Sequence, residues 1–327
     1  MEFREEISKN NLVNLYKTMM KIRMFEEKVA DLLFADEIKC PTHLYIGEEA
    51  IAAGICANLQ KDDYAFGTYR SHGFYIAKGG NINGLMSELL GKDTGCSRGK
   101  GGSMHVVAPE IGILGTTAIV GGIIPLAVGS AMAVKMKNDN RIVVSFFGDG
   151  ATDEGVFYES INFASLKKIP IILVCENNFY STHLPLRFRQ PADNIYQRVR
   201  TFKIPAVRID GNDVIKTYLT AKNAIEYVRN KGGPFFVECK TYRWRAHVGP
   251  WDDIDVGFRT KKEIEKWKKK CPIKRIEKVL MKKHFLNTKK KDEIVRKINE
   301  EINQAYNFAK QSPYPETNDL EENVYKQ

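Results

Sequence analysis

Two short apolar runs, each closed by turn residues, are the clearest feature of the hydrophobic pattern. They are residues 141–150 (RIVVSFFGDG) and 169–178 (IPIILVCENN). Continuous apolar runs of this length are typical of parallel strands that are buried on both faces. The segment between them, 153–168, has apolar residues at helical spacing, so the three pieces predict one β-α-β unit.

The rest of the chain follows the same alternation of helical and extended patterns. Further strands are predicted at 206–210 and 234–244, residues 61–80 are predicted to be loop, and 91–122, with nine glycines, a long connection. The predicted helices cover 10–35, 47–60, 121–137 (buried, with small residues for close packing), 213–231 and much of a charged tail at 260–312. This order predicts an α/β fold with an open, mostly parallel sheet and helices on both faces.

No repeat or low-complexity linker divides the chain, so a single domain is expected. Within it we predict a helical N-terminal arm (1–45), a core that binds the ligand (46–245), and a C-terminal part with an active-site loop and a charged helical tail (246–327).

Composition adds limits on the kind of protein. The 327 residues are 43% hydrophobic and 28% charged, as in ordinary globular proteins. No apolar run reaches the ~18 residues that span a bilayer. The start, MEFREEISKN, has no signal-peptide core, and the six cysteines form no C-x-x-C pair. These features favour a cytoplasmic protein with reduced thiols.

The net charge of +10 raises the question of nucleic-acid or membrane binding. Much of the excess lies in lysine-rich stretches after residue 260, interleaved with glutamate and apolar residues at helical spacing. Solvated helix faces are the favoured interpretation, so neither nucleic acid nor membrane is expected as a partner, although an acidic protein is compatible with this charge.

Polar residues end both strands of the predicted β-α-β unit. Asp149, between Gly148 and Gly150, follows the first strand, and Asn178 follows the second. The carboxyl ends of parallel strands form one edge of a sheet, and ligands bind there. A carboxylate and an amide oxygen suit Mg²⁺ with phosphates completing its shell, and a helix starting near Thr152 favours an anion. A capped turn explains Gly-Asp-Gly taken alone, but not the second polar end.

Two other phosphate motifs are excluded by their spacing. In GCSRGKGGSMH, Lys100 is followed by glycine rather than Ser or Thr, so the P-loop pattern fails. GDGATDEG lacks the third glycine of a dinucleotide motif.

Gly148-Asp149-Gly150, about thirty residues and Asn177-Asn178 together resemble the thiamine diphosphate motif. The stretches HLYIGEEAIAAGICANL, YRSHGFYIAKGG, RGKGGSMHV, AIVGGIIPLAVGSAMA and ECKTYRWRAH are similar to the alpha subunits of two-chain 2-oxo acid dehydrogenases, the pyruvate, branched-chain and acetoin enzymes. The resemblance covers residues 10 to 275 and implies the thiamine diphosphate-binding fold.

The resemblance also implies roles for single residues. Asp149 and Asn178 would bind Mg²⁺ by side chain, and Tyr180 by its carbonyl. Gly148, Gly150 and Ala151 would line the diphosphate. Tyr69 and Arg70 would hold it from another loop. Gly121 and Ile124 would contact the aminopyrimidine. His247 would be the active-site histidine, touching cofactor or acyl intermediate. His72 and His105 stay open between supporting and purely structural roles.

The family's mechanism implies a second chain. A glutamate beside the aminopyrimidine activates the cofactor, and in two-chain members a beta subunit provides it. An α2β2 heterotetramer is therefore expected, which decarboxylates a 2-oxo acid and passes the acyl group to the lipoyl group of an acyltransferase.

The loop around His247 departs from the family. Arg245, Ala246 and Val248 replace the usual histidine, glycine and serine, so regulation by phosphorylation of that serine is not expected. Two alternatives remain open: a related carboligase with a non-lipoyl acceptor, and a non-catalytic binding subunit.

Overall fold

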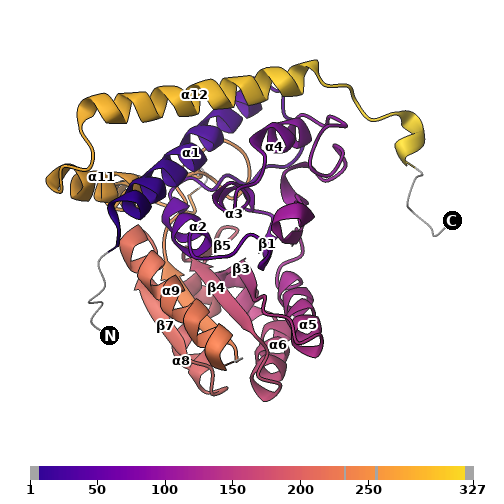
Figure 1. Ribbon diagram of the computed structural model, residues 1–327, viewed down its shortest axis with the longest axis vertical. Helices are drawn as coiled ribbons and strands as arrows, with labels where there is room; N and C mark the ends of the chain where they lie inside the picture. Colours follow the sequence, from indigo (N-terminus) through magenta and orange to yellow (C-terminus); the bar gives the residue numbers. More distant parts are fainter. Residues whose placement is uncertain (1–6, 232, 255–256, 321–327) are drawn as a thin grey trace.

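A six-stranded, all-parallel sheet forms the centre of the computed structural model, which describes residues 7–231, 233–254 and 257–320 (Figure 1). The strand order is β2-β1-β3-β4-β8-β7. The strands are β1 (Tyr64–Thr68), β2 (Ile113–Thr117), β3 (Val143–Gly148), β4 (Ile171–Asn177), β7 (Ala206–Asp210) and β8 (Phe235–Lys240). The predicted α/β class and parallel sheet are confirmed.

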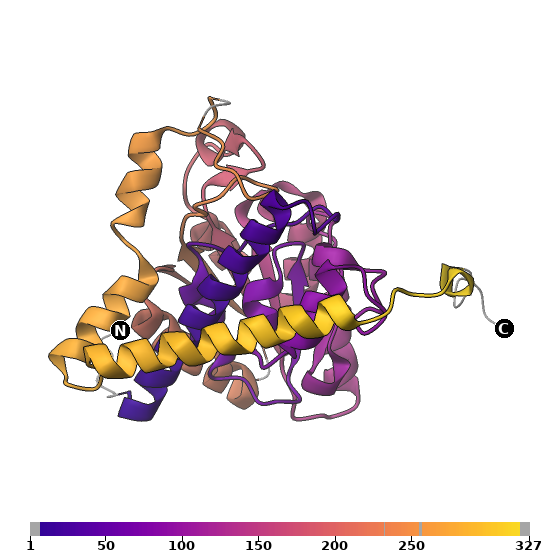
Figure 2. The same ribbon diagram turned by 90° about the horizontal axis from the view of Figure 1, so that it is seen from above.

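Helices cover both faces of this sheet, each over its own apolar core. Alternate residues of one strand face opposite cores, as Phe146 and Phe147 of β3 do. One face carries α1 (Lys9–Phe34), α2 (Glu49–Cys56), α3 (His72–Ala77), α4 (Ile82–Leu89), α9 (Val214–Lys231), α11 (Pro272–Lys282) and α12 (Thr288–Gln311). The other carries α5 (Ile123–Met136), α6 (Gly155–Leu166) and α8 (Ile195–Arg200). Helix α12 crosses α1 and ends next to α4 (Figures 1 and 2).

The predicted β-α-β unit is β3, α6 and β4. The two strands are parallel neighbours, with Gly148 opposite Glu176. The helix begins later than expected, at Gly155, because residues Asp149–Asp153 form a 3₁₀ turn first.

The prediction of loop for residues 61–80 is wrong, since β1 and α3 lie there. Gly67 explains why the strand escaped notice. A Cβ at this position would lie 2.1 Å from Cε1 of Phe74 in α3. The Phe74 ring therefore fits against the strand only because residue 67 has no side chain. The glycine-rich connection likewise contains β2 as well as two 3₁₀ turns.

The glycine-rich loop is built around a carboxylate of the protein itself. Glu88, which is 1% exposed, accepts hydrogen bonds from the amides of Ser97 (2.7 Å), Gly99 (2.9 Å), Gly101 (2.7 Å) and Gly102 (2.9 Å). Amides that could cradle a phosphate are thus already satisfied, which agrees with the rejection of a P-loop.

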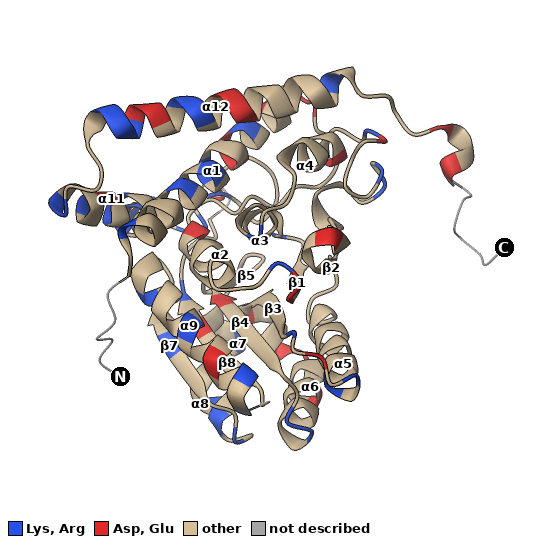
Figure 3. Cartoon of the chain, in the orientation of Figure 1, with Lys and Arg blue, Asp and Glu red and all other residues tan. Residues whose placement is uncertain are grey.

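The excess positive charge lies on one arm of the molecule. Residues 261–291 contain fourteen Lys or Arg and three Glu, and they form α10 (Lys261–Lys268), α11 and the start of α12 (Figure 3). The interpretation of this arm as a solvated surface stays a prediction. Within the described ranges, no helix is long and apolar enough to cross a membrane.

Candidate active site

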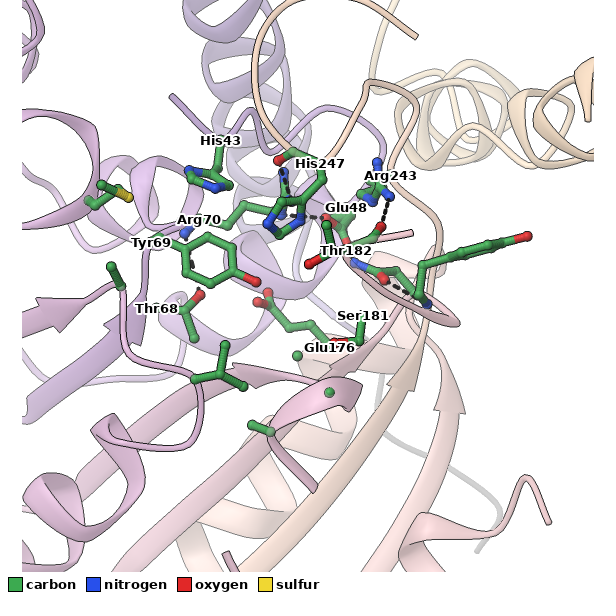
Figure 4. A pocket seen from close by; sticks show the side chains of 18 of the residues that line it. His43, Glu48, Thr68, Tyr69, Arg70, Glu176, Ser181, Thr182, Arg243 and His247 are labelled. Carbon is green, nitrogen blue, oxygen red and sulfur yellow. Dashed lines mark hydrogen bonds and ion pairs between the residues drawn. The ribbon is translucent and has the colours of Figure 1, made fainter. Parts of the chain in front are cut away.

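A cavity of about 870 Å³, counting the space at its open mouth, lies at the carboxyl ends of the strands. The loops that follow β1, β3, β4 and β8 meet there, together with the segments before α2 and α5. This is the edge where the sequence places a ligand. Figure 4 shows Tyr69 and His247 pointing into it from the loops after β1 and β8, and Glu176 from the end of β4.

Most of the residues predicted from the sequence line this cavity. They are Tyr69, Arg70, Gly121, Gly148, Gly150, Ala151, Asn178, Tyr180 and His247. Asp149 is fully buried next to it, and Ile124 does not line it. Ile124 is buried in the core between α5 and the sheet, so its contact with a ligand stays a prediction.

Asp149 and Asn178 lie on adjacent strand ends, as expected. The Asn178 side chain donates to Oε1 of Glu48 (3.2 Å), and its Oδ1 accepts the Tyr180 amide (3.3 Å). Asp149 pairs through Oδ2 with Arg189, whereas Oδ1 has no hydrogen-bond partner among the described residues. Burial raises the pKa of Asp149, and the Arg189 charge opposes this. A buried carboxylate oxygen without a partner calls for an unseen one.

These groups fit a magnesium ion held against a phosphate. No cluster of three His, Cys, Asp or Glu that could hold a metal occurs in the described part of the chain, so the ion would need other oxygens as well. Asp149 Oδ1, the second lone pair of Asn178 Oδ1 and phosphate oxygens are such ligands. Gly150 also has a steric reason to be glycine, since a Cβ there would meet Ser181 Oγ at 2.6 Å.

Arg70 is the cation best placed for a diphosphate. Its guanidinium donates to the carbonyls of Leu44 (2.5 Å) and His247 (3.2 Å), and its Nε lies 3.6 Å from Oε2 of Glu48. A guanidinium has five N–H donors, so two remain for a ligand. The side chain is only 7% exposed, and low exposure strengthens such contacts.

Three aromatic rings gather at the cavity wall. The ring centroids of His43 and Tyr69 are 4.3 Å apart, those of His43 and His247 4.9 Å, and those of Tyr69 and His247 5.4 Å. Burial, helped by Arg70, lowers the pKa of His247 to about 3 and that of His43 to about 2. Both imidazoles are therefore neutral at pH 7 and can accept hydrogen bonds.

The backbone of the loop that carries His247 is held at several points. The amide of Ala246 donates to the Trp251 carbonyl (2.8 Å) and that of Gly249 to Thr42 (2.8 Å). Gly249 has φ +82°, and a Cβ there would lie 2.5 Å from the Trp251 ring. These two hydrogen bonds and the positive φ of Gly249 define the shape of the loop.

The histidines left open by the sequence lie outside the cavity. His72 is buried between Glu26 (3.2 Å) and Ser103 (3.0 Å). His105 faces the carbonyl of Thr116 (3.3 Å). Both therefore have structural partners.

The sequence missed several cavity residues, and the most informative are His43, Glu48, Glu176 and Arg243. Glu176 is two residues before Asn178 on β4, and the period-two alternation of a strand could have revealed it. Burial and the charge of Glu48 raise the pKa of Glu176 to about 8. Tyr45 donates its hydroxyl to the same carboxyl group.

The neutral histidines predict a dependence of stability on pH. In the unfolded chain both would titrate near 6.5, but in the folded chain only far below it. The unfolded state therefore binds more protons as pH falls below 6.5, and stability is lost. Each histidine is expected to contribute about 2 kcal/mol to the loss between pH 7 and 5. In urea unfolding, His247→Asn should lose about 2 kcal/mol less stability than wild type between pH 7 and 5.

The control is His284→Asn, at an exposed position with φ 55°, which asparagine tolerates. This variant should keep the wild-type pH dependence. An unchanged dependence in His247→Asn would show that the buried imidazole is not held neutral.

Comparison with known proteins defines the class of this site. The family model described as Dehydrogenase E1 component matches residues 16–318. The chain belongs to this family, the alpha subunits of thiamine diphosphate-dependent 2-oxo acid dehydrogenases, as the sequence motifs predicted.

Individual relatives support the same assignment. The chain is 39% identical over 312 residues to the alpha subunit of acetoin:2,6-dichlorophenolindophenol oxidoreductase of Bacillus subtilis, covering 95% of this chain and 92% of the relative. It is 35% identical over 318 residues to the pyruvate dehydrogenase E1 component subunit alpha of Rickettsia felis, covering 97% of each. The corresponding chloroplastic alpha-3 subunit of Arabidopsis thaliana is 36% identical, with 98% and 75% covered.

Proposed function

We propose that this chain binds magnesium and thiamine diphosphate in the cavity and, with a beta subunit, decarboxylates a 2-oxo acid and passes the acyl group to a lipoyl carrier. The observation that carries the proposal is the unpartnered Oδ1 of Asp149 beside Asn178 at the strand ends. When bound, thiamine diphosphate supplies the electron sink for breaking the bond to the carboxyl carbon.

The residues of the chain would bind and orient. Asp149, Asn178 and the Tyr180 carbonyl are the proposed metal ligands. Arg70 and Tyr69, with the backbone of Gly148–Ala151, would hold the diphosphate. Gly121 would face the aminopyrimidine with its backbone.

His247 would donate the N–H of its neutral imidazole to an oxygen of the substrate or of the acyl group. A neutral imidazole can accept a proton and return it, although its lowered pKa makes it a weak base.

An uncovered apolar face supports the beta partner. Helix α5 was predicted to be buried, but Leu126, Gly129, Ala133 and Met136 are exposed along one side of it. Phe163 and Leu166 of α6, which packs against α5, are exposed as well. Large exposed apolar patches mark protein interfaces, and small residues let a helix approach closely. The face continues into Val120, which lines the cavity, so a partner here would help to enclose the ligand.

Leu126→Glu should prevent assembly because it places a charge in this interface. Co-expressed with the beta subunit, the variant is expected to elute as a folded but separate chain in size-exclusion chromatography. Leu126 is 59% exposed, so little stability should be lost. The control is Phe308→Glu on α12, far from α5 (Figure 1). Normal assembly of Leu126→Glu would place the interface elsewhere.

The unusual sequence of the His247 loop is a reason to test a second acyl acceptor. Arg245 pairs with Glu27 of α1 (2.6 Å) and donates to the Pro250 carbonyl (2.9 Å), so a new side chain helps to fix this loop. The assembled complex should therefore be assayed with free lipoamide and with an aldehyde. Acyl transfer to lipoamide supports the dehydrogenase, whereas carbon–carbon bond formation alone supports a carboligase.

Binding of the cofactor tests the proposal and its remaining alternative, a non-catalytic subunit. Calorimetry of the complex should show uptake of thiamine diphosphate only when magnesium is present. Absence of binding under these conditions would contradict the proposed function.

A further inference from the structure

Arg189 reaches the proposed metal ligand from a different part of the chain. It ends α7 (Leu186–Arg189), which follows the small hairpin of β5 (Tyr180–Ser181) and β6 (Leu184–Pro185). Its guanidinium pairs with Oδ2 of Asp149 and with Asp153, and its Nε donates to the Leu184 carbonyl (3.2 Å). The side chain is 8% exposed, so this is a largely dehydrated ion pair.

The ion pair with Arg189 compensates the charge of the buried Asp149 carboxylate. A fully buried carboxylate is costly unless a cation or several donors compensate it. Its other oxygen has no partner in the described part of the chain, so Arg189 provides the main compensation. A divalent ion beside the same carboxylate would be repelled by a guanidinium held there.

Asp153 is a second ion-pair partner for the Arg189 guanidinium. Asp153 already pairs with it, and the Asp153 side chain is 28% exposed, against 1% for Asp149. If the guanidinium leaves Asp149, it can stay paired at Asp153 nearer to solvent. Gln190, the next residue, is tied to Thr152 (2.9 Å) and Asp153 (2.6 Å), so the backbone of this segment need not leave.

We propose that Arg189 is the internal counter-cation of Asp149, which a divalent metal ion must displace, and that it thereby sets the metal affinity of the site. The inference rests on the metal site of the proposed function. It assigns a role to a residue that lies outside the sequence motifs and does not line the cavity. The short hairpin before α7 contains Tyr180, Ser181 and Thr182, which line the cavity. Displacement of Arg189 would therefore also affect the cavity wall.

The test compares Arg189→Gln and Arg189→Lys in the complex with the beta subunit. The probe is magnesium chloride, titrated by calorimetry in the presence of thiamine diphosphate. Loss of the competing charge should lower the magnesium concentration at half-saturation about tenfold in Arg189→Gln. Arg189→Lys keeps the charge and should stay within about twofold of wild type. Arg187→Gln, on the exposed side of α7, is the matched control and should change nothing.

A second readout concerns the metal-free chain. Arg189→Gln should unfold at a lower temperature than wild type in EDTA, because Asp149 loses its compensation, and magnesium with thiamine diphosphate should restore most of the difference. If this variant folds only in the presence of both, the inference is likewise supported. Failure of magnesium and cofactor to rescue it would overturn the inference.

The outcomes separate this inference from the proposed function. Unchanged or weaker magnesium binding in Arg189→Gln, with a metal-dependent wild type, overturns the role of Arg189 alone. If wild type takes up thiamine diphosphate equally in EDTA and in magnesium, the proposed metal site is wrong. The inference about Arg189, which depends on that site, is then wrong as well.

Discussion

Asp149→Asn is expected to reduce 2-oxo acid decarboxylation by the complex to below about 1% of wild type. The substitution keeps the size of the side chain but removes the only carboxylate proposed to bind magnesium. Loss of a group that merely orients a ligand weakens metal binding about 10- to 100-fold, so loss of the ligand itself should cost at least as much. Calorimetry should show the same loss in magnesium-dependent binding of thiamine diphosphate.

Asp153→Asn is the matched control for this variant. Asp153 also pairs with Arg189, but it does not line the cavity and is partly exposed. At saturating magnesium, where metal affinity does not limit the rate, its activity should remain within about threefold of wild type. Full metal-dependent binding by Asp149→Asn would contradict the site, whereas similar losses in both variants would point to the Arg189 network instead.

Glu88→Ala is expected to lower the free energy of unfolding by about 4 kcal/mol or more. Four amide hydrogen bonds to one buried carboxylate would be lost together. A hydrogen bond to a charged group contributes about 1.5–3 kcal/mol, although the contributions are not additive. Urea denaturation of the isolated chain measures this directly. Glu88→Gln, which keeps one acceptor oxygen, should lose less.

The control is Glu110→Ala, because Glu110 is exposed in the same glycine-rich region. It should change stability by about 0.5 kcal/mol or less. A loss below about 1 kcal/mol in Glu88→Ala would show that the loop does not depend on its internal carboxylate.

Local pattern predicted the part of the fold that is locally encoded. The apolar runs of β3 and β4 and the helical spacing of α6 define a β-α-β unit without knowledge of distant contacts. From its parallel geometry follows the juxtaposition of Asp149 and Asn178, so half of the candidate site could be predicted.

The rest depends on contacts between distant segments. Gly67 belongs to a strand because it accommodates Phe74, and no periodicity reveals such an exchange. Ile124 lies in the core because α5 packs this side of its first turn against the sheet. Arg189 meets Asp149 across forty residues of chain, and Glu88 meets its four amides across a loop of glycines. Only the folded structure shows these pairings.

The burial prediction for α5 has a different lesson. Its composition suits a buried helix, yet one side is exposed in the single chain. Burial of that side therefore requires a second chain, which agrees with the expected heterotetramer.

The central claim is that catalysis needs this chain and a partner together. Release of CO₂ from 2-oxo acids should be measured with the purified chain, the beta subunit and their mixture, each with magnesium and thiamine diphosphate. Turnover in the mixture alone is the predicted result, because this chain is proposed to anchor the cofactor and the partner to provide the activating glutamate. Substantial turnover by the lone chain would contradict the account.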